Sequence, residues 1–221
     1  MSVTICFDFG NTRLKAAIFK NKELLEMRVL ENDRPETIQA LLDECKPDKT
    51  ILSSVIHHDK AIETQLAAHS KFHLLGPATF INFTTPVGKP ETIGADRLAL
   101  VAAAVDLYPN QHNLIISLGT CITYNFVNIA HEFLGGSISP GMQMRFRAMH
   151  EQTALLPLIE ASNEFPLVGY DTKTNLLSGV ILGIAAEIDG IIAAYADKYG
   201  NFNVLLTGGD ISYFVPHIKK R

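Results

Sequence analysis

The sequence predicts an α/β protein built from two similar units. Short β-rich apolar runs alternate with segments of helical spacing along its 221 residues. A pattern of apolar strand, polar residue, apolar residue, Gly and Thr occurs in Ile5–Thr12 and again in Ile115–Thr120. The two copies begin the two halves of the chain, which is long enough for one large or two small domains. We therefore expect a duplication, with units at residues 1–100 and 101–221.

The first half predicts a sheet with two helices. Gly10-Asn11 is a strong turn signal between two β-rich runs, so a hairpin is expected. Pro35 suits the first turn of a helix, and Asp59 suits an N-cap. The expected strands are Val3–Phe9, Arg13–Phe19, Glu23–Leu30 and Thr50–Val55, with strand-like pieces at Phe72–Leu75 and Phe80–Phe83; the helices are Pro35–Cys45 and Asp59–His69.

The second half begins after a loop that contains Pro86, Gly88 and Pro90. Gly135-Gly136 and Pro140-Gly141 bracket what we expect to be a second loop. The expected helices are Leu98–Leu107, Met142–Gln152 and Lys173–Tyr199, and the expected strands are Leu114–Leu118, Cys121–Val127 and Val204–Leu206.

Composition and charge exclude several classes of protein. Hydrophobic residues make up 47% of the chain, which excludes a disordered protein. The net charge of −4 provides no basic field for nucleic acid or an anionic membrane. Glu187 and Asp189 interrupt the most apolar run, which argues against a membrane span. Neither a signal peptide nor a CxxC pair is present, so we expect a cytoplasmic protein without a membrane or nucleic-acid partner.

The repeated glycine turns favour nucleotide binding. A Gly-Thr tip exposes backbone N–H groups and a hydroxyl to a phosphate, and two tips facing across a cleft can hold a polyphosphate. Asp8 could hold Mg²⁺ and Lys15 could reach a phosphate. Either turn alone is typical of an ordinary hairpin. The repeat, with a third glycine pair at Gly208-Gly209, shifts the balance toward a nucleotide, although GxxxxGK[ST] and GxGxxG are absent.

The segment Gly94-Ala95-Asp96-Arg97 places opposite charges side by side at an expected helix start. One interpretation is a general base beside an anion-binding guanidinium. The other is an Asp stabilised by the helix dipole next to a solvated Arg. The segment alone does not decide between them.

Taken together and in order, these motifs resemble those of the type III pantothenate kinases. That family belongs to the actin, hexokinase and heat-shock-chaperone ATPase superfamily. The resemblance runs through nearly the whole chain. It is carried by Asp8-Phe9-Gly10-Asn11-Thr12 with Lys15, Gly94-Ala95-Asp96-Arg97, Leu118-Gly119-Thr120, Gly135–Gly141, Thr153–Pro157, Gly169–Thr172 and Thr207-Gly208-Gly209.

The resemblance implies duplicated ribonuclease-H-like (actin-like ATPase) domains with a nucleotide cleft between them. It implies that ATP and pantothenate give ADP and 4′-phosphopantothenate, the first step of coenzyme A biosynthesis, with Mg²⁺. Asp96 would be the general base, and Thr172 would contact pantothenate across a homodimer interface. The other implied pantothenate contacts are Gly94, Ala95 and Arg97, and the implied ATP contacts are Asp8, Phe9, Gly10, Asn11, Thr12, Lys15, Gly119, Thr120, Gly208 and Gly209.

Three features depart from the family pattern. Ser117 stands where the family usually has an Asp that binds a monovalent cation, so a K⁺ or NH₄⁺ site there is expected to be weak or absent. Val87 stands where the family usually has a Tyr that lines the pantothenate pocket. The sequence ends at Arg221, where one more element is expected.

Two other functions are compatible with the same motifs. One is a kinase of another small hydroxyl compound. The other is a non-catalytic transcriptional accessory protein of the same fold. The presence of Asp8, Asp96, Arg97 and Thr120 favours a catalytic protein.

Overall fold

The computed structural model describes residues 2–220, which fold into two compact units. The first unit holds the described residues up to Asn82 together with Val87–Ala103. The second holds Phe83–Pro86 and the described residues from Ala104 onward. The chain passes from one to the other within helix α3 (Ala95–Leu107).

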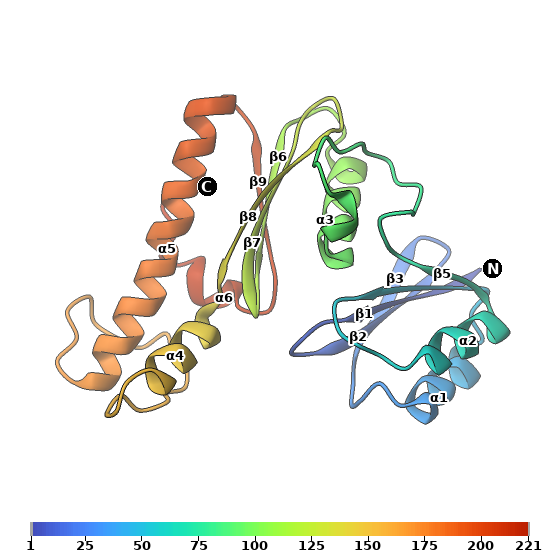
Figure 1. Cartoon of the computed structure of the whole chain (residues 1–221), viewed down its shortest axis with the longest axis horizontal. Coiled ribbons are helices and arrows are strands. Elements are labelled where there is room, and N and C mark those ends of the chain that lie inside the picture. The colour runs from blue at the N-terminus through green and yellow to red at the C-terminus, as the bar shows by residue number, and fades with distance from the viewer. Residues whose placement is uncertain (1, 221) are drawn as a thin grey trace. The chain divides into compact units, whose positions relative to one another are not determined.

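The first unit is built on a five-stranded sheet of order β3-β2-β1-β4-β5. Strands β1, β2 and β3 form an antiparallel meander, and β4 and β5 continue the sheet parallel to β1. Helices α1 and α2 pack on one face of this sheet (Figure 1). The bounds are β1 Val3–Phe9, β2 Leu14–Lys20, β3 Glu23–Leu30, α1 Pro35–Cys45, β4 Lys49–Ser54, α2 Lys60–His69, β5 Lys71–Leu74 and the 3₁₀ helix η1 Pro90–Thr92.

Alternation along β1 divides its side chains between the two faces of the sheet. Ile5, Phe7 and Phe9 are buried in a core that includes Ile38 of α1 and Ile62 of α2. Because successive strand residues point to opposite faces, Asp8 lies on the face away from these helices. The packing of the hydrophobic core therefore fixes the side on which this carboxylate is presented.

The second unit is built on a four-stranded sheet of order β8-β7-β6-β9. Strand β6 is antiparallel to β7 and parallel to β9, as β1 is to β2 and β4. Helices α4 and α5 and the short helix α6 complete its core. The bounds are β6 Asn113–Leu118, β7 Cys121–Val127, β8 Phe133–Pro140, α4 Met142–Glu151, α5 Thr172–Tyr199, β9 Asn203–Thr207 and α6 Ile211–Phe214.

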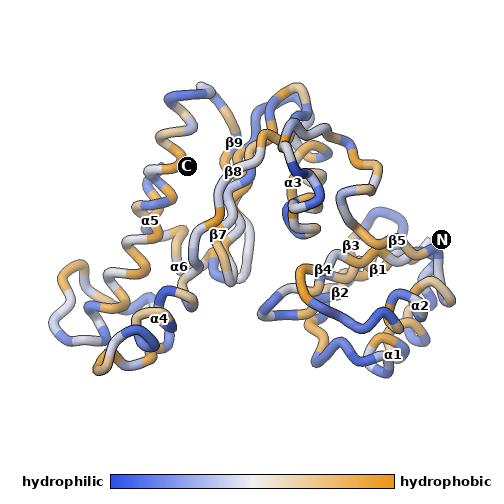
Figure 2. Tube along the Cα trace, in the orientation of Figure 1, coloured by the Kyte–Doolittle hydropathy of each residue, from blue (hydrophilic) through white to orange (hydrophobic). Residues whose placement is uncertain are grey.

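Helix α5 is the main apolar element of the second unit. Asp171 caps it through a capping box with Thr174, in which each side chain bonds a backbone N–H of the other. Among the described residues it alone is long and apolar enough to cross a membrane. Ile181, Ile184 and Ile188 are nevertheless fully buried in the core, and Figure 2 shows hydrophilic residues between the hydrophobic ones. These features are typical of a core helix.

Two expectations from the sequence are wrong, and one helix was not predicted. Residues 80–83 form no strand, and the Phe80 side chain is completely exposed; pairing begins only at the next residue, where Thr84 forms an isolated bridge to Glu132. The segment from Gly135 to Pro140 belongs to strand β8 and pairs with β7, because glycines are tolerated in a strand at the edge of the sheet. Helix α6, after β9, had no recognised signal.

An aromatic cluster around Phe126 anchors α5 to the sheet of the second unit. The Phe126 ring stacks on His112 and Tyr199, with ring centroids 5.8 and 4.3 Å away. We expect Phe126→Ala to lower the free energy of unfolding by about 3–5 kcal/mol, the usual cost of removing a buried aromatic ring. Phe80→Ala is the matched control and should change it by less than ~0.5 kcal/mol. Urea unfolding of both variants measures the difference, and equal effects would contradict this account of the core.

Candidate active site

The first group of candidate residues gathers where β1 ends. Asp8 lies opposite Lys15 of β2 and beside Ser53 of β4 in the sheet register. After β1 the chain turns tightly, and Gly10 N donates to Arg13 O over 3.1 Å. Asn11 and Thr12 are exposed at the tip of this turn. Paired strand residues share a face, so a cation, a carboxylate and a hydroxyl are placed in one row.

The environment of Asp8 favours the presence of a cation. Burial raises the pKa of the Asp8 carboxyl, the Lys15 charge lowers it, and the Asp96 charge raises it again, with a net shift upward. The Asp96 contribution shows that the two carboxylates are close enough to repel each other. A metal ion bound beside them would relieve that repulsion.

Asp96 lies in the first turn of α3, where the helix dipole favours an acidic side chain. The helix starts at Gly94, whose carbonyl accepts from Arg97 N at 3.0 Å. The Asp96 carboxylate folds back over Gly94, so that a Cβ at residue 94 would lie 2.5 Å from Asp96 Oδ1. The same Cβ would lie 3.8 Å from Val55 Cγ1 at the end of β4. The segment thus brings Asp96 to the end of the strands that carry Asp8.

The carboxylates of the first unit suit Mg²⁺ better than a transition metal. Residues 2–220 contain no group of three or more His, Cys, Asp or Glu side chains arranged to hold a metal ion. Mg²⁺ keeps several of its waters and is usually bound through one or two carboxylates and the substrate phosphates. Asp8, with Asp96 nearby, fits that donor set.

The second group of candidate residues gathers at the turn between β6 and β7. Gly119 N donates to Cys121 O, and Thr120 is exposed at the tip. Gly141 N donates to Thr120 O over 3.1 Å, which ties the start of α4 to the turn. Asp210 N donates to Leu118 O over the same distance.

Close backbone packing brings the third glycine motif to the same turn. Gly208 has φ +109°, and a Cβ there would overlap the backbone of Leu118, so glycine is required. The second and third glycine motifs of the sequence are therefore adjacent in the second unit. Gly141 and Asp210 also belong to this arrangement. Gly141 ends one of the motifs that carry the family resemblance, but neither residue was predicted to support the turn.

Ser117 lies in a row of neutral hydroxyl side chains. Its register partners are Thr123 on β7 and Thr207 on β9. This row occupies the position in the second sheet that Lys15, Asp8 and Ser53 occupy in the first. Oxygen ligands are available there, but these three residues supply no formal negative charge.

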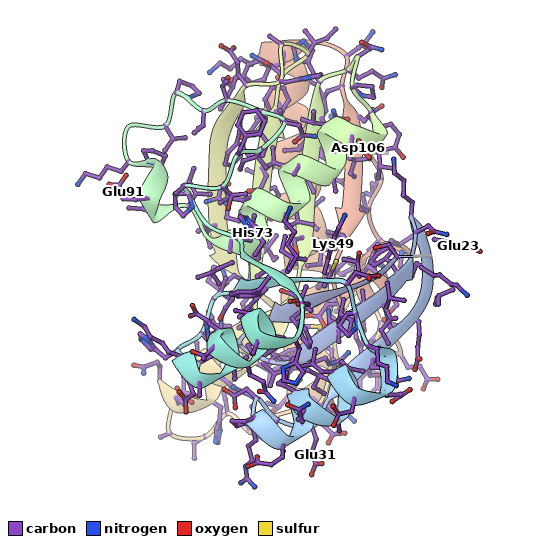
Figure 3. All side chains as sticks on the ribbon, turned by 90° about the vertical axis from the view of Figure 1, so that its right-hand side faces the viewer. Glu23, Glu31, Lys49, His73, Glu91 and Asp106 are labelled. Atoms are coloured by element: carbon purple, nitrogen blue, oxygen red, sulfur yellow. The ribbon has the colours of Figure 1, made fainter. Side chains whose placement is uncertain are left out.

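The remaining predicted residues lie on loops or at element ends. Val87 is half-buried on the loop ahead of η1, from which Glu91 projects into solvent (Figure 3). Thr172 is exposed at the first turn of α5. Gly209 is exposed beside Gly208.

His58 has a structural role that the sequence did not reveal. Its ring accepts or donates at Ser54 Oγ (2.9 Å) and Glu63 (3.1 Å), and it packs edge-on against Phe9. These contacts fasten the end of β4 beside the end of β1. The sequence offered only an isolated His57-His58 pair, which has no distinctive spacing.

The fold is shared with solved structures of low sequence identity. A Campylobacter jejuni protein described as a Baf family transcriptional activator superposes with a TM-score of 0.59 at 21% identity, covering 97% of this chain and 88% of that one. Component A of the Acidaminococcus fermentans (R)-2-hydroxyglutaryl-CoA dehydratase gives 0.51 at 13% identity, covering 97% and 85%. These likenesses concern the fold alone, which is a duplicated actin-like α/β fold.

Sequence relatives are closer. The protein named type III pantothenate kinase of Christiangramia forsetii is 40% identical over 210 residues, which cover 94% of this chain and 86% of the relative. The protein of the same name in Cytophaga hutchinsonii is 38% identical over 220 residues, covering 99% and 91%. The family model of type III pantothenate kinases matches residues 4–194. The chain therefore belongs to the type III pantothenate kinase family.

Proposed function

We propose that Asp96 is the general base of an ATP-dependent pantothenate kinase and that Asp8 is its magnesium ligand. The kinase activity follows from family membership. The observation that supports the two assignments is the proximity of Asp8 and Asp96: the Gly94 segment over which Asp96 folds lies beside Val55, next to the end of β4, and the Asp96 charge raises the pKa of Asp8. It joins the end of β1 to the start of α3 in one unit, so a metal-bound phosphate and a reacting hydroxyl can be held side by side.

The reaction requires positioning and charge neutralisation more than covalent chemistry. Asp96 accepts the proton of the primary hydroxyl of pantothenate as that oxygen attacks the γ-phosphorus of ATP. The bond from phosphorus to the β,γ-bridging oxygen breaks, and ADP leaves. Lys15 supplies positive charge to the phosphates, and Mg²⁺, when bound, neutralises the charge on them.

The glycine turns supply neutral donors to the nucleotide. Gly10 and Gly119 close the two turns through their own N–H groups, and because they lack a Cβ they let phosphate oxygens approach the backbone of the turns. Asn11 and the hydroxyls of Thr12 and Thr120, exposed at the two tips, bind these oxygens. Phe9 is buried and fixes the first turn from below. Gly208 and Gly209 approach the adenosine. Gly94, Ala95, Arg97 and Val87 line the pantothenate site, with Thr172 contributed by a second subunit.

The alternatives differ in one measurement. A non-catalytic accessory protein would release no ADP, and a kinase of another hydroxyl compound, without its own acceptor, would release only the ADP that slow hydrolysis by water gives, with or without pantothenate. We expect ADP release from Mg·ATP to depend on pantothenate. ADP release that is absent, or unaffected by pantothenate, would contradict the proposed function. Relatives that carry the kinase name favour pantothenate-dependent release of ADP.

Asp96→Asn tests the general base. The change is nearly isosteric, so the fold and nucleotide affinity should remain, while kcat should fall about a hundredfold or more because proton abstraction is lost. Asp106→Asn, at the other end of α3 and exposed, is the matched control and should retain wild-type kcat (Figure 3). Steady-state kinetics measure both variants. Wild-type turnover by Asp96→Asn would overturn the assignment.

Asp8→Asn tests the magnesium ligand through stability. The pKa of Asp8 is raised in the folded state, so its favourable contribution to stability at acid pH is lost as the pH rises through the raised pKa. At neutral pH the ionised Asp8 therefore destabilises the fold. We expect Asp8→Asn to melt at a higher temperature than wild type at pH 7, with a smaller difference at pH 4.

Magnesium should act in the opposite direction and stabilise wild type more than Asp8→Asn. MgCl₂ with ADP should raise the melting temperature of wild type more than that of Asp8→Asn, because the charged carboxylate is a stronger ligand for the ion than the neutral amide. Differential scanning calorimetry with and without EDTA measures both effects. An equal magnesium response in the two proteins would contradict the assignment.

Ser117 tests the requirement for a monovalent cation. A serine hydroxyl is a weaker ligand for an alkali ion than a carboxylate, and Thr123 and Thr207 beside it are also neutral. We expect little activation by KCl in a buffer whose other cation is a bulky organic one. Ser117→Asp should gain saturable activation, with Ser117→Asn as the uncharged control. Strong potassium activation of wild type would refute the proposal.

We also propose a homodimer, with Thr172 reaching the pantothenate of the partner. Leu167, Val168 and Tyr170 are each about four-fifths exposed just ahead of Thr172, and such a patch is typical of a protein interface. Light scattering at micromolar concentration should give twice the mass of the 24.3 kDa chain. Tyr170→Asp should shift the protein toward monomer and raise the KM for pantothenate. A monomeric wild type would remove the argument for Thr172.

A further inference from the structure

A partly buried ion pair lies next to the segment that supports the Gly119-Thr120 turn, and the mechanism above does not use it. It joins Arg145 of α4 to Glu187 of α5 through Arg145 Nη2 and Glu187 Oε2. The two side chains are 24% and 27% exposed. A partly buried ion pair is costly to desolvate unless further hydrogen bonds satisfy its two charged groups. The other hydrogen-bond partners of Arg145 and Glu187 therefore show which segments the pair stabilises.

Arg145 satisfies the end of strand β8. Its Nε donates to Pro140 O at 2.9 Å, and its Nη2 donates to Ser139 Oγ at 3.0 Å. The planar guanidinium therefore binds the last two residues of β8 with N–H donors whose directions are fixed. A lysine ammonium is a point charge and cannot reproduce both directions.

Glu187 holds the Arg145 side chain in place. Its Oε1 accepts from Tyr124 Oη at 2.9 Å, so α5, α4 and β7 meet at one carboxylate. Although burial raises the pKa of Glu187, hydrogen bonds from Arg145, Ser139 and Tyr124 hold it below its usual range. Burial and the same carboxylate raise the pKa of Tyr124. The pair is therefore charged at neutral pH, and the phenol remains a donor.

The segment that Arg145 binds is in direct contact with the Thr120 turn. Gly141 follows Pro140, and its N–H donates to Thr120 O at 3.1 Å. A Cβ at Gly141 would overlap the carbonyl oxygens of Gly119 and Thr120, so the two backbones are in direct contact. A displacement of Pro140 would therefore be transmitted to the turn, which a packed backbone contact cannot absorb.

We propose that Arg145, held by Glu187, is a positioning residue that sets the place of the Gly119-Thr120 turn for the nucleotide phosphates. This inference rests on the proposed phosphate contact of Thr120. Arg145 does not touch the nucleotide. It acts by fixing the backbone against which the turn is built, since misplacement of a binding group by a fraction of an ångström weakens the contact.

The test compares Arg145→Met with Arg147→Met, an exposed arginine on the same helix that serves as the matched control. The probe is the non-hydrolysable ATP analogue AMPPNP with Mg²⁺, titrated by calorimetry, alongside the KM values for ATP and pantothenate. We expect Arg145→Met to raise the Kd of AMPPNP and the KM for ATP about tenfold. The KM for pantothenate should change less than twofold, and Arg147→Met should match wild type.

Two further variants separate positioning from general damage. Arg145→Lys keeps the charge and should recover part of the nucleotide affinity, and it serves as the test if Arg145→Met does not fold. The double variant Arg145→Met/Thr120→Ala should lose less affinity than the product of the single losses, because both changes act on one contact. Full multiplicativity, or an equal rise in both KM values, would overturn the inference.

Thr120→Ala distinguishes this inference from the proposed function. If Thr120→Ala weakens AMPPNP binding and folded Arg145→Met does not, the positioning role is wrong and the phosphate assignment survives. If Thr120→Ala leaves AMPPNP binding unchanged, the phosphate assignment is wrong, and the positioning role falls with it.

Discussion

Strand alternation in β1 is the constraint on which the first unit depends. Phe7 and Phe9 must be buried against α1 and α2, and this requirement alone directs Asp8 to the other face. A slip of one residue would bury the carboxylate and expose two aromatic rings. The hydrophobic core therefore fixes the orientation of the functional group, and the functional group adds nothing to the core. Its raised pKa shows that the ionised carboxylate opposes folding at neutral pH.

The second unit holds the Gly119-Thr120 turn in place by different means. Around Thr120 the contacts are backbone to backbone, from Gly141 on one side and from the Gly208–Asp210 segment on the other. Such contacts leave no side chain free to adjust, so the position of the turn follows that of β8, α4 and β9. The charged groups Arg145 and Glu187 lie behind this layer, where they fix the neighbouring segments.

The sequence predicted the elements well because their signals are local. Asp59 caps α2 as expected, accepting from Ala61 N at 2.8 Å, and α1 spans the predicted Pro35–Cys45. Errors arose where the outcome depends on distant partners. Gly135 and Gly136 are turn signals in isolation, yet β7 pairs with them, and the apolar Phe80 lacks a partner strand.

In the candidate site, too, the residues that stand in local motifs were predicted, and those whose roles depend on distant contacts were not. Asp8, Asp96 and Thr120 stand in recognisable motifs, and the structure places the two carboxylates near each other. The supporting roles of Gly141, Asp210 and Arg145 could not be predicted, because they come from contacts with Leu118, Thr120 and Glu187 that no spacing encodes. The assignment of chemistry to these residues rests on the family pattern. Their spatial grouping rests on the fold.

Because the two sheets share one strand arrangement, the charges at equivalent positions of the two units can be compared. In both, the residue two positions before the turn glycine sits between an antiparallel and a parallel neighbour. In the first unit that residue is Asp8, and Lys15 and Ser53 flank it. In the second it is Ser117, flanked by two threonines. A partly buried carboxylate needs a cation beside it, whether from a lysine or a bound ion, because the unbalanced charge is costly to desolvate. The first row keeps its carboxylate and supplies a lysine, whereas the second row removes the charge. With no charge to balance, the hydroxyl row of the second unit can be stable without a bound ion, and its residues can remain in place through hydrogen bonding and backbone pairing alone.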